Sequence, residues 1–291
     1  MPDPAYYSDH GAWVSFAKDW IERTDSLSQI AGIRKSYIRK LRAVGCETMK
    51  EFAVNDIPPV KGIPNATLAK LKAQAEIQHE SRGLEKPLFK IFQHDNGKGL
   101  SSLPPASALD VFFDIEGHPL YDGGLEYLWG CSYRCPDAVQ GKLYAFKDWW
   151  VHTPEQEKAA FDGFIDWVYD RWKRDNTLHV YHYANYEVAA MRKLSTRYET
   201  RIKEIAEMLA NGVFVDLYRI VLNGVLIGEP RYSIKNVEHL FRSKRTTQVA
   251  NGGDSVIAYE LWREQGGVTR WSDDANGYRS WLADPQRLAG Q

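Results

Sequence analysis

One apolar stretch of the chain, residues 109–117, ends in two carboxylates and a glycine. Its valine, phenylalanine and isoleucine side chains are typical of a buried β-strand. Because the side chains of a strand alternate between the two faces of a sheet, Asp114 and Glu116 lie on the same face. Two carboxylates that close repel each other, and a shared proton or a bound cation relieves the repulsion. Taken alone, such a pair is also typical of a solvated strand edge.

A cation at this strand end would be a hard one. Carboxylate oxygens suit Mg²⁺ or Mn²⁺ better than Zn²⁺. Gly117, which follows the two acids, permits close approach of a ligand or of backbone. Residues elsewhere in the sequence are needed to distinguish a metal site from a solvated strand edge.

The composition is that of a globular protein rich in aromatic side chains. The 291 residues are enough for one large or two ordinary domains, with 44% apolar and 26% charged residues. The net charge of −1 means that a nucleic acid would have to be recognised by local clusters of Lys and Arg. Three cysteines with no preceding secretory segment predict a reduced, cytoplasmic protein. No apolar run approaches the roughly 18 residues that span a bilayer, so no membrane partner is expected.

Residues 26–78 alternate short helical segments with Gly and Pro. Twice, a glycine separates a short apolar segment from a longer helix: Gly32 precedes residues 36–44, and Gly62 precedes residues 66–79. Such a turn exposes backbone N–H groups at a helix N-terminus, where the helix dipole favours a phosphate. This arrangement is that of a helix-hairpin-helix, and we expect Gly32 and Gly62 to bind nucleic acid.

A basic run accompanies the first of these turns. Five positive charges and no negative one fall within residues 34–42, which favours contact with phosphates. A solvated helix face in a compact helical bundle is the alternative. The predicted nucleic-acid-binding side chains are Arg34, Lys35, Arg39 and Lys40.

The remaining chain divides by its periodicity. Residues 81–107 carry turn residues throughout and lack sustained periodicity, so we predict a linker there. We therefore expect a small helical domain at residues 1–80, a second domain at 108–265 and an irregular C-terminal tail at 266–291.

The second domain has a recognisable order of elements. Three strands joined by tight turns predict an antiparallel meander, and helices then alternate with two further strands. The predicted strands are 109–117, 126–133, 142–146, 178–183 and 213–217, and the predicted helices are 155–173, 185–198, 201–210 and 233–241. This is the order of the ribonuclease H fold, an α/β fold with a mixed sheet and flanking helices, here preceded by a small all-α, helix-hairpin-helix-like domain.

A third acid, Glu187, falls in the first turn of the helix after the fourth predicted strand. The fold would bring it beside Asp114 and Glu116. A two-metal site needs several carboxylates to hold cations about 4 Å apart, one ion activating water and the other stabilising the leaving oxygen of a phosphodiester. These three acids are the predicted catalytic and metal-binding residues.

Several strings of the chain resemble the YprB-like ribonuclease H domain of RecB-family nucleases. The resemblance extends over residues 26–262 and rests on residues 112–117, 124–130, 181–187, 213–217 and 232–235. It implies a relative of the DEDD 3′–5′ exonucleases, which would hydrolyse DNA or RNA with Mg²⁺ or Mn²⁺. It also implies work within a larger nuclease or helicase assembly.

The resemblance assigns roles residue by residue. Asp114 and Glu116 match the first motif, Glu187 takes the acidic place of the second, and Asp216 matches a strand acid that is a further candidate metal ligand. Tyr183 and Tyr186 are candidates for stacking on bases of a single strand, with aromatic packing as the alternative. His118 and His182 are expected to support the ligands of the ion or to lie in turns, and not to bind the ion themselves, because Mg²⁺ prefers oxygen.

The fourth acid of the family has no counterpart in this sequence. In the family it belongs to a Tyr-Asn-x-x-Asp-Asp-Cys string after a segment like residues 255–262. This chain continues differently, although Asp273 and Asp274 could substitute. We therefore expect a truncated or rewritten C-terminus. The alternative function is a catalytically inactive, nucleic-acid-binding or scaffolding fragment of a larger RecB-like nuclease.

Overall fold

The structure is a computed structural model that describes residues 11–92, 97–135, 144–243 and 252–264. The chain divides into two compact units. The helical unit comprises residues 1–103 and 218–244, and the sheet unit comprises residues 104–217 and 245–291. Residues 218–244, which the sequence analysis assigns to the second domain, therefore belong to the helical unit. Among the described helices, none combines the length and apolar character needed to cross a membrane.

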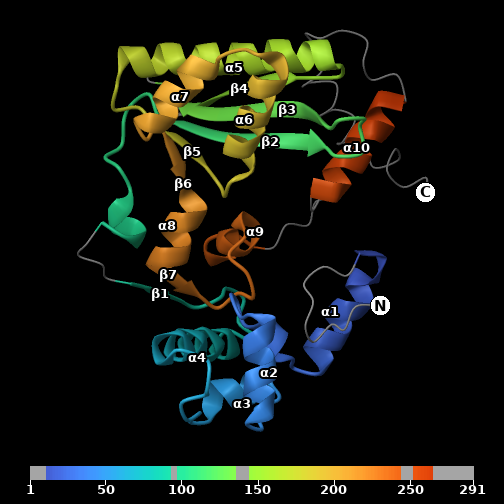
Figure 1. The fold of residues 1–291 in the computed structure, drawn as a ribbon, viewed down its shortest axis with the longest axis vertical. Coiled ribbons are helices and arrows are strands. Elements are labelled where there is room, and N and C mark those ends of the chain that lie inside the picture. The colour runs from blue at the N-terminus through green and yellow to red at the C-terminus, as the bar shows by residue number, and fades with distance from the viewer. Residues whose placement is uncertain (1–10, 93–96, 136–143, 244–251, 265–291) are drawn as a thin grey trace. The chain divides into compact units, whose positions relative to one another are not determined.

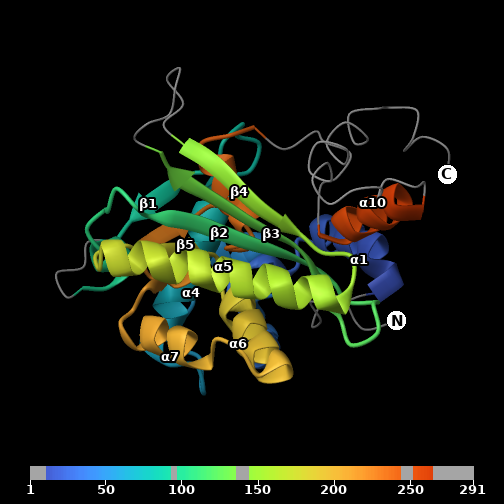
Figure 2. The same ribbon diagram turned by 90° about the horizontal axis from the view of Figure 1, so that it is seen from above.

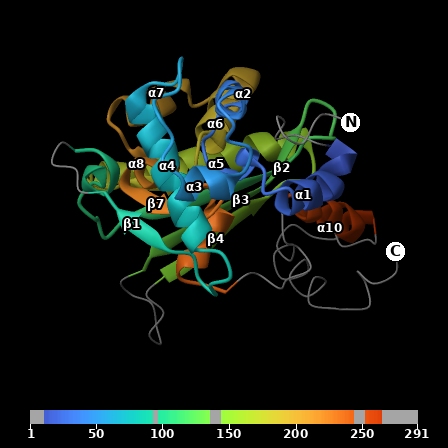
Figure 3. The same ribbon diagram turned by 90° about the horizontal axis from the view of Figure 1, so that it is seen from below.

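The helical unit begins with short helices around a small apolar core. Residues Leu27, Ile38, Leu41 and Phe52 are almost fully buried in this core. The short third helix starts with a capping box, in which the Thr48 side chain accepts from the backbone of Glu51. Helices α3 and α4 pack against each other (Figure 3). The helices are α1 (Val14–Arg23), α2 (Lys35–Ala43), α3 (Met49–Val54) and α4 (Asn65–Glu80).

A two-stranded antiparallel sheet lies within the helical unit, and its first strand falls in the predicted linker of residues 81–107. Strand β1 (Phe89–Ile91) pairs with β7 (Val225–Ile227), which follows helix α8 (Leu217–Gly224). The buried Gln74 amide of α4 donates to the carbonyl of Ile227 at 2.9 Å and accepts from the hydroxyl of Tyr232 at 2.8 Å. These bonds hold β7 on α4 and explain why residues 218–244 join this unit. The short helix α9 (Ile234–Val237) follows.

The sheet unit is built on a five-stranded mixed sheet with the order β4-β3-β2-β5-β6. Strands β4, β3 and β2 are antiparallel, whereas β2, β5 and β6 are parallel. The predicted ribonuclease H-like α/β class is confirmed by this sheet and its flanking helices. The strands are β2 (Val111–His118), β3 (Leu125–Arg134), β4 (Tyr144–Trp150), β5 (Val180–His182) and β6 (Phe214–Asp216).

Helix α5 packs along one face of this sheet, as Figure 2 shows. Phe113 of β2 stacks on Phe164 of α5, with ring centroids 4.1 Å apart, and both rings belong to the hydrophobic core of this unit. The Thr153 hydroxyl caps α5, and Pro154 occupies its first turn. Helix α10 lies beside the end of β2 (Figure 1), where Tyr259 stacks on Tyr127. The helices of this unit are α5 (Pro154–Arg174), α6 (Tyr186–Tyr198), α7 (Ile202–Ala210) and α10 (Gly252–Glu264).

Candidate functional site

The two acids of β2 lie on the face of the sheet opposite the α5 core. Val111, Phe113 and Ile115 are buried, and the alternate positions are exposed or half-buried. Asp114 and Glu116 occupy two of these alternate positions, so the predicted alternation is confirmed. Immediately after Glu116 the register between β2 and β3 shifts, forming a β-bulge.

Glu187 meets Asp114 from the first turn of α6. The two carboxyl groups lie close enough for each to affect the protonation of the other. Desolvation, together with the negative charges of Glu116 and Glu187, raises the pKa of Asp114 to about 7. The structure therefore brings the three predicted acids close enough to repel one another, and this repulsion favours the protonated form of Asp114.

Glu187 also carries a buried oxygen that lacks a good donor. Its side chain and that of His182 are each 4% exposed, and Oε2 of Glu187 lies 3.5 Å from Nδ1 of His182. Neither atom has a hydrogen-bond partner within the described chain. A buried carboxylate oxygen without a donor costs free energy. A cation would satisfy it.

The types of these side chains suit a divalent ion better than their present arrangement does. An all-carboxylate set is the one that Mg²⁺ or Mn²⁺ takes, and the unsatisfied oxygen of Glu187 agrees with it. In the parts of the chain that the structure describes, however, no three His, Cys, Asp or Glu side chains converge as ligands of one ion. The side chains of the three acids would have to rotate to hold one.

Asp216, the fourth predicted ligand, stands at the end of β6 and contacts the turn between β5 and α6. Its Oδ1 accepts a hydrogen bond from the backbone N–H of Ala184 at 2.9 Å. Ala184 has φ +74°, a left-handed conformation that costs a non-glycine residue free energy. Asp216 thus stabilises a strained turn that leads directly into Glu187.

Tyr186, a predicted stacking residue, is fixed by an acid that the sequence analysis did not single out. Its hydroxyl donates to Oε2 of Glu126 at 2.7 Å. Glu126 is 7% exposed, although a glutamate near the start of a strand gives no sequence signal for this role. Tyr183, the other predicted stacking residue, lies in the turn just before α6.

A cavity of about 500 Å³ lies within the sheet unit, where Tyr186 and Glu126 are part of its lining. The side chains of Glu126, Tyr186 and Lys193 line it together with His118. Nε2 of His118 lies 2.7 Å from Oε1 of Glu260, an acid of α10 that the sequence analysis also did not single out. Asp273 and Asp274, the candidate substitutes for the fourth acid, lie outside the described residues.

In the helical unit, the predicted glycine turns precede α2 and α4. Gly32 and Gly62 have φ of +78° and +82°, which a glycine adopts without strain. Nζ of Lys40 donates to the carbonyl of Gly62 at 2.6 Å, so this predicted phosphate ligand links α2 to the second turn. Three further basic residues are exposed, namely Arg34, Lys35 and Arg39.

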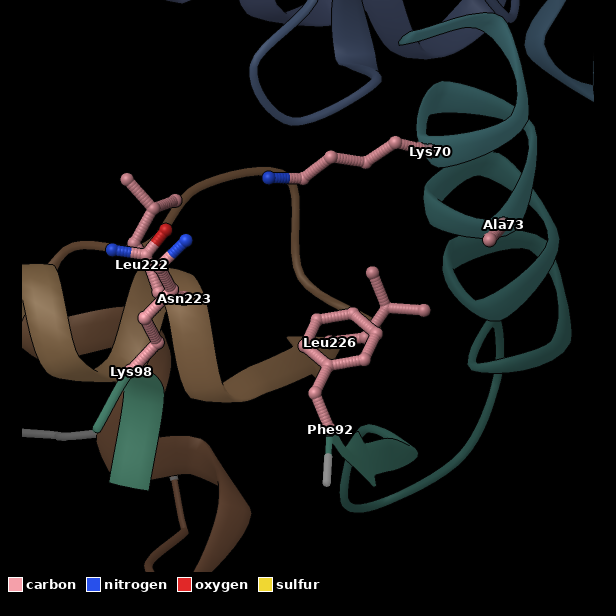
Figure 4. Close-up of a pocket in the computed structure, with 7 residues that line it drawn as sticks. All are labelled: Lys70, Ala73, Phe92, Lys98, Leu222, Asn223 and Leu226. Atoms are coloured by element: carbon pink, nitrogen blue, oxygen red, sulfur yellow. The ribbon is translucent and has the colours of Figure 1, made fainter. Parts of the chain in front are cut away.

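A second cavity, of about 300 Å³, lies elsewhere in the helical unit. Figure 4 shows the Lys70 side chain extending from α4 across this cavity, with the Phe92 ring close to Leu226. Lys98 and Asn223 are also part of the lining. The lining of this cavity therefore contains two basic side chains, in addition to the basic residues in and before α2.

A known protein family matches the part of the chain that contains the five-stranded sheet. The sequence model of the family described as the RNase H superfamily matches residues 111–276, more than half of the chain. The match includes all three acids that meet at β2 and α6. Among curated proteins and solved structures, nothing matches the chain.

Proposed function

Because the chain belongs to the RNase H superfamily, we propose that it is a metal-dependent nuclease that hydrolyses phosphodiester bonds of DNA or RNA. The observation that carries the proposal is the close approach of the Asp114 and Glu187 carboxyl groups, next to the charge of Glu116. Three carboxyl groups that repel each other at one place are costly to a fold, and they fit a cation-binding role.

The proposed roles follow from this geometry. Asp114, Glu116 and Glu187 would hold Mg²⁺ or Mn²⁺, which when bound supplies an activated water and stabilises the leaving oxygen of the phosphodiester. Desolvation and the neighbouring negative charges raise the pKa of Asp114 to about 7, so near neutral pH a bound ion would compete with a proton for this carboxyl group. Lys193, in the lining of the neighbouring cavity, can meet a phosphate of the substrate.

The finer assignment rests on the resemblance to the YprB-like domain. We propose on this basis a 3′–5′ exonuclease of the RecB-family type that works with a larger nuclease or helicase. Asp216 is proposed as a support of the turn before Glu187, with a direct metal contact as the alternative.

Cleavage assays test the proposal. Labelled single- and double-stranded DNA and RNA are incubated with Mg²⁺ or Mn²⁺ and with wild type, Asp114→Asn or Glu187→Gln. We expect cleavage that needs the ion and falls by about 100-fold or more in both variants. Asp170→Asn, which removes an exposed carboxylate of α5, is the matched control and should cleave like wild type. Equal rates for wild type and Asp114→Asn would refute the enzymatic proposal.

A second candidate function is nucleic-acid binding by the helical unit, as a fragment that does not cleave. It is favoured by the two glycine turns before α2 and α4 and by the exposed side chains of Arg34, Lys35 and Arg39. Binding would then persist in Asp114→Asn and fall steeply with salt. Binding that does not depend on salt would contradict this function.

A further inference from the structure

The hydrogen bond between Tyr186 and Glu126 passes directly over Gly117, which has no side chain. A Cβ atom added to Gly117 would lie 2.1 Å from the Tyr186 hydroxyl oxygen and 2.6 Å from Oε2 of Glu126. These distances are far below van der Waals contact, so the bond occupies the space that any other residue at position 117 would fill. The bond therefore joins three elements at one point: the bulge of β2, the start of β3 and the first residue of α6.

This bond acts on the backbone next to two of the three acids. Gly117 follows Glu116 directly, and Tyr186 precedes Glu187 directly. The buried Glu126 carboxylate needs a donor to offset its desolvation, and the Tyr186 hydroxyl provides one at 2.7 Å. A change in the bond would therefore shift the first turn of α6 relative to β2.

The other end of the same turn is also held by an acid. Asp216 accepts from the N–H of Ala184, two residues before Tyr186. The turn that delivers Glu187 is thus held from β6 on one side and from β3 on the other. This double support keeps a strained turn in one conformation.

We propose that Tyr186 and Glu126 are positioning residues of the carboxylate site, and that their bond over Gly117 holds Glu187 against Asp114. This inference rests on the proposed nuclease function. Second-layer hydrogen bonds that orient ligands of a metal typically change its affinity by 10- to 100-fold when they are removed. Tyr186 is 51% exposed and lines the cavity beside Glu126, so its hydroxyl must be tested separately from its ring.

The experiment measures Mn²⁺ binding by calorimetry, together with kcat and KM on a labelled oligonucleotide. Tyr186→Phe keeps the ring and removes only the hydroxyl. We expect Mn²⁺ affinity to fall about tenfold or more and kcat to fall with it, while KM stays unchanged because the ring remains. Glu126→Gln keeps an acceptor and should retain the affinity, whereas Glu126→Leu should lose it as Tyr186→Phe does.

The chain offers a matched control on the same helix. The Tyr198 hydroxyl, near the other end of α6, donates to the buried carboxylate of Glu157. Tyr198→Phe therefore removes a similar bond away from the three acids. We expect it to lower the melting temperature without changing Mn²⁺ affinity.

The outcomes separate the two proposals. Wild-type affinity in Tyr186→Phe, or an equal loss in Tyr198→Phe, would overturn the positioning role while leaving the proposed function in place. A wild-type protein that binds no Mn²⁺ and does not cleave would overturn both. Circular dichroism of each variant shows whether it is folded, and Tyr186→Phe, which removes a single oxygen atom, keeps the test decisive if Glu126→Leu unfolds.

Discussion

Asp114→Asn should stabilise the metal-free protein at high pH. The carboxyl group has its pKa raised from 3.8 to about 7 in the folded protein, first by burial and then by Glu116 and Glu187. The folded state therefore binds the proton more tightly than the unfolded state does. Its stability falls as pH rises from about 4 to about 7 and is lowest above that range. Asparagine has no charge to desolvate, so the variant should not suffer this loss.

The size of the effect follows from the shift. At about 1.4 kcal/mol for each pKa unit, the full shift would correspond to roughly 4 kcal/mol. The Asp114 side chain keeps contact with solvent, and screening reduces the figure to about 1–2 kcal/mol. Asp114→Asn should thus gain about 1–2 kcal/mol over wild type at about pH 8, relative to the difference between the two proteins at about pH 4.5.

Urea denaturation in EDTA measures this gain. Both proteins are unfolded at the two pH values, and the free energies of unfolding are compared within each pH. Asp170→Asn is the control, because this exposed α5 carboxylate should give the same difference from wild type at both. A gain for Asp114→Asn that does not grow with pH, or a loss that does, would refute the account of the repelling acids.

Three further predictions concern the same structure. Saturating Mg²⁺ or Mn²⁺ at about pH 8 should stabilise wild type by about 2–3 kcal/mol at 100 times the dissociation constant, and thermal melting should show no such gain for Asp114→Asn. Gly117→Ala should displace the Tyr186 hydroxyl from Glu126, lower stability by about 1–2 kcal/mol and weaken Mn²⁺ binding as Tyr186→Phe does; calorimetry that shows wild-type affinity would contradict this. Replacing both Arg34 and Arg39 by Ala should make the negative slope of log affinity against log salt less steep by about 2 for duplex DNA. Fluorescence anisotropy at several salt concentrations measures this slope, and an unchanged slope would mean that these side chains do not contact phosphates.

Much of the sheet unit could be predicted because its signals are local. The alternation along residues 109–117 defines a strand and places both acids on one face. Helix α5 has a start signal in Thr153-Pro154 and an apolar stripe over its whole length, and its predicted bounds of 155–173 differ from the observed Pro154–Arg174 by one residue at each end. Strand pairs joined by short turns and amphipathic helices can be recognised within a window of a few residues.

The sheet of β1 and β7 could not be predicted in this way. Each strand has three residues, and the two lie far apart in the sequence. Pairing of such short strands depends on non-local contacts, here the amide of Gln74 and the hydroxyl of Tyr232. Because a turn-rich segment with a three-residue strand has no period to detect, residues 81–107 were indistinguishable from a linker.

One part of the carboxylate site could likewise be predicted from local signals, and another part could not. Glu187 could be placed beside β2 from the order of elements alone, because a helix that follows a parallel strand starts at the same sheet edge. The hydrogen bond from Tyr186 to Glu126 could not be predicted from the sequence, because the register of β2 and β3 shifts between Glu116 and Gly117. A one-residue shift changes which side chains face each other across a sheet, and no local pattern reports it.

The surroundings of Gly117 determine from which side a ligand can reach the acids. A glycine after two acids predicts room for a ligand or for backbone to come close, but the space is taken by the Tyr186 hydroxyl and the Glu126 carboxylate. The protein itself therefore occupies this side of the two acids. If a cation and a phosphate bind, they must approach Asp114 and Glu187 without displacing that bond, since displacement would release the turn that holds Glu187 in place.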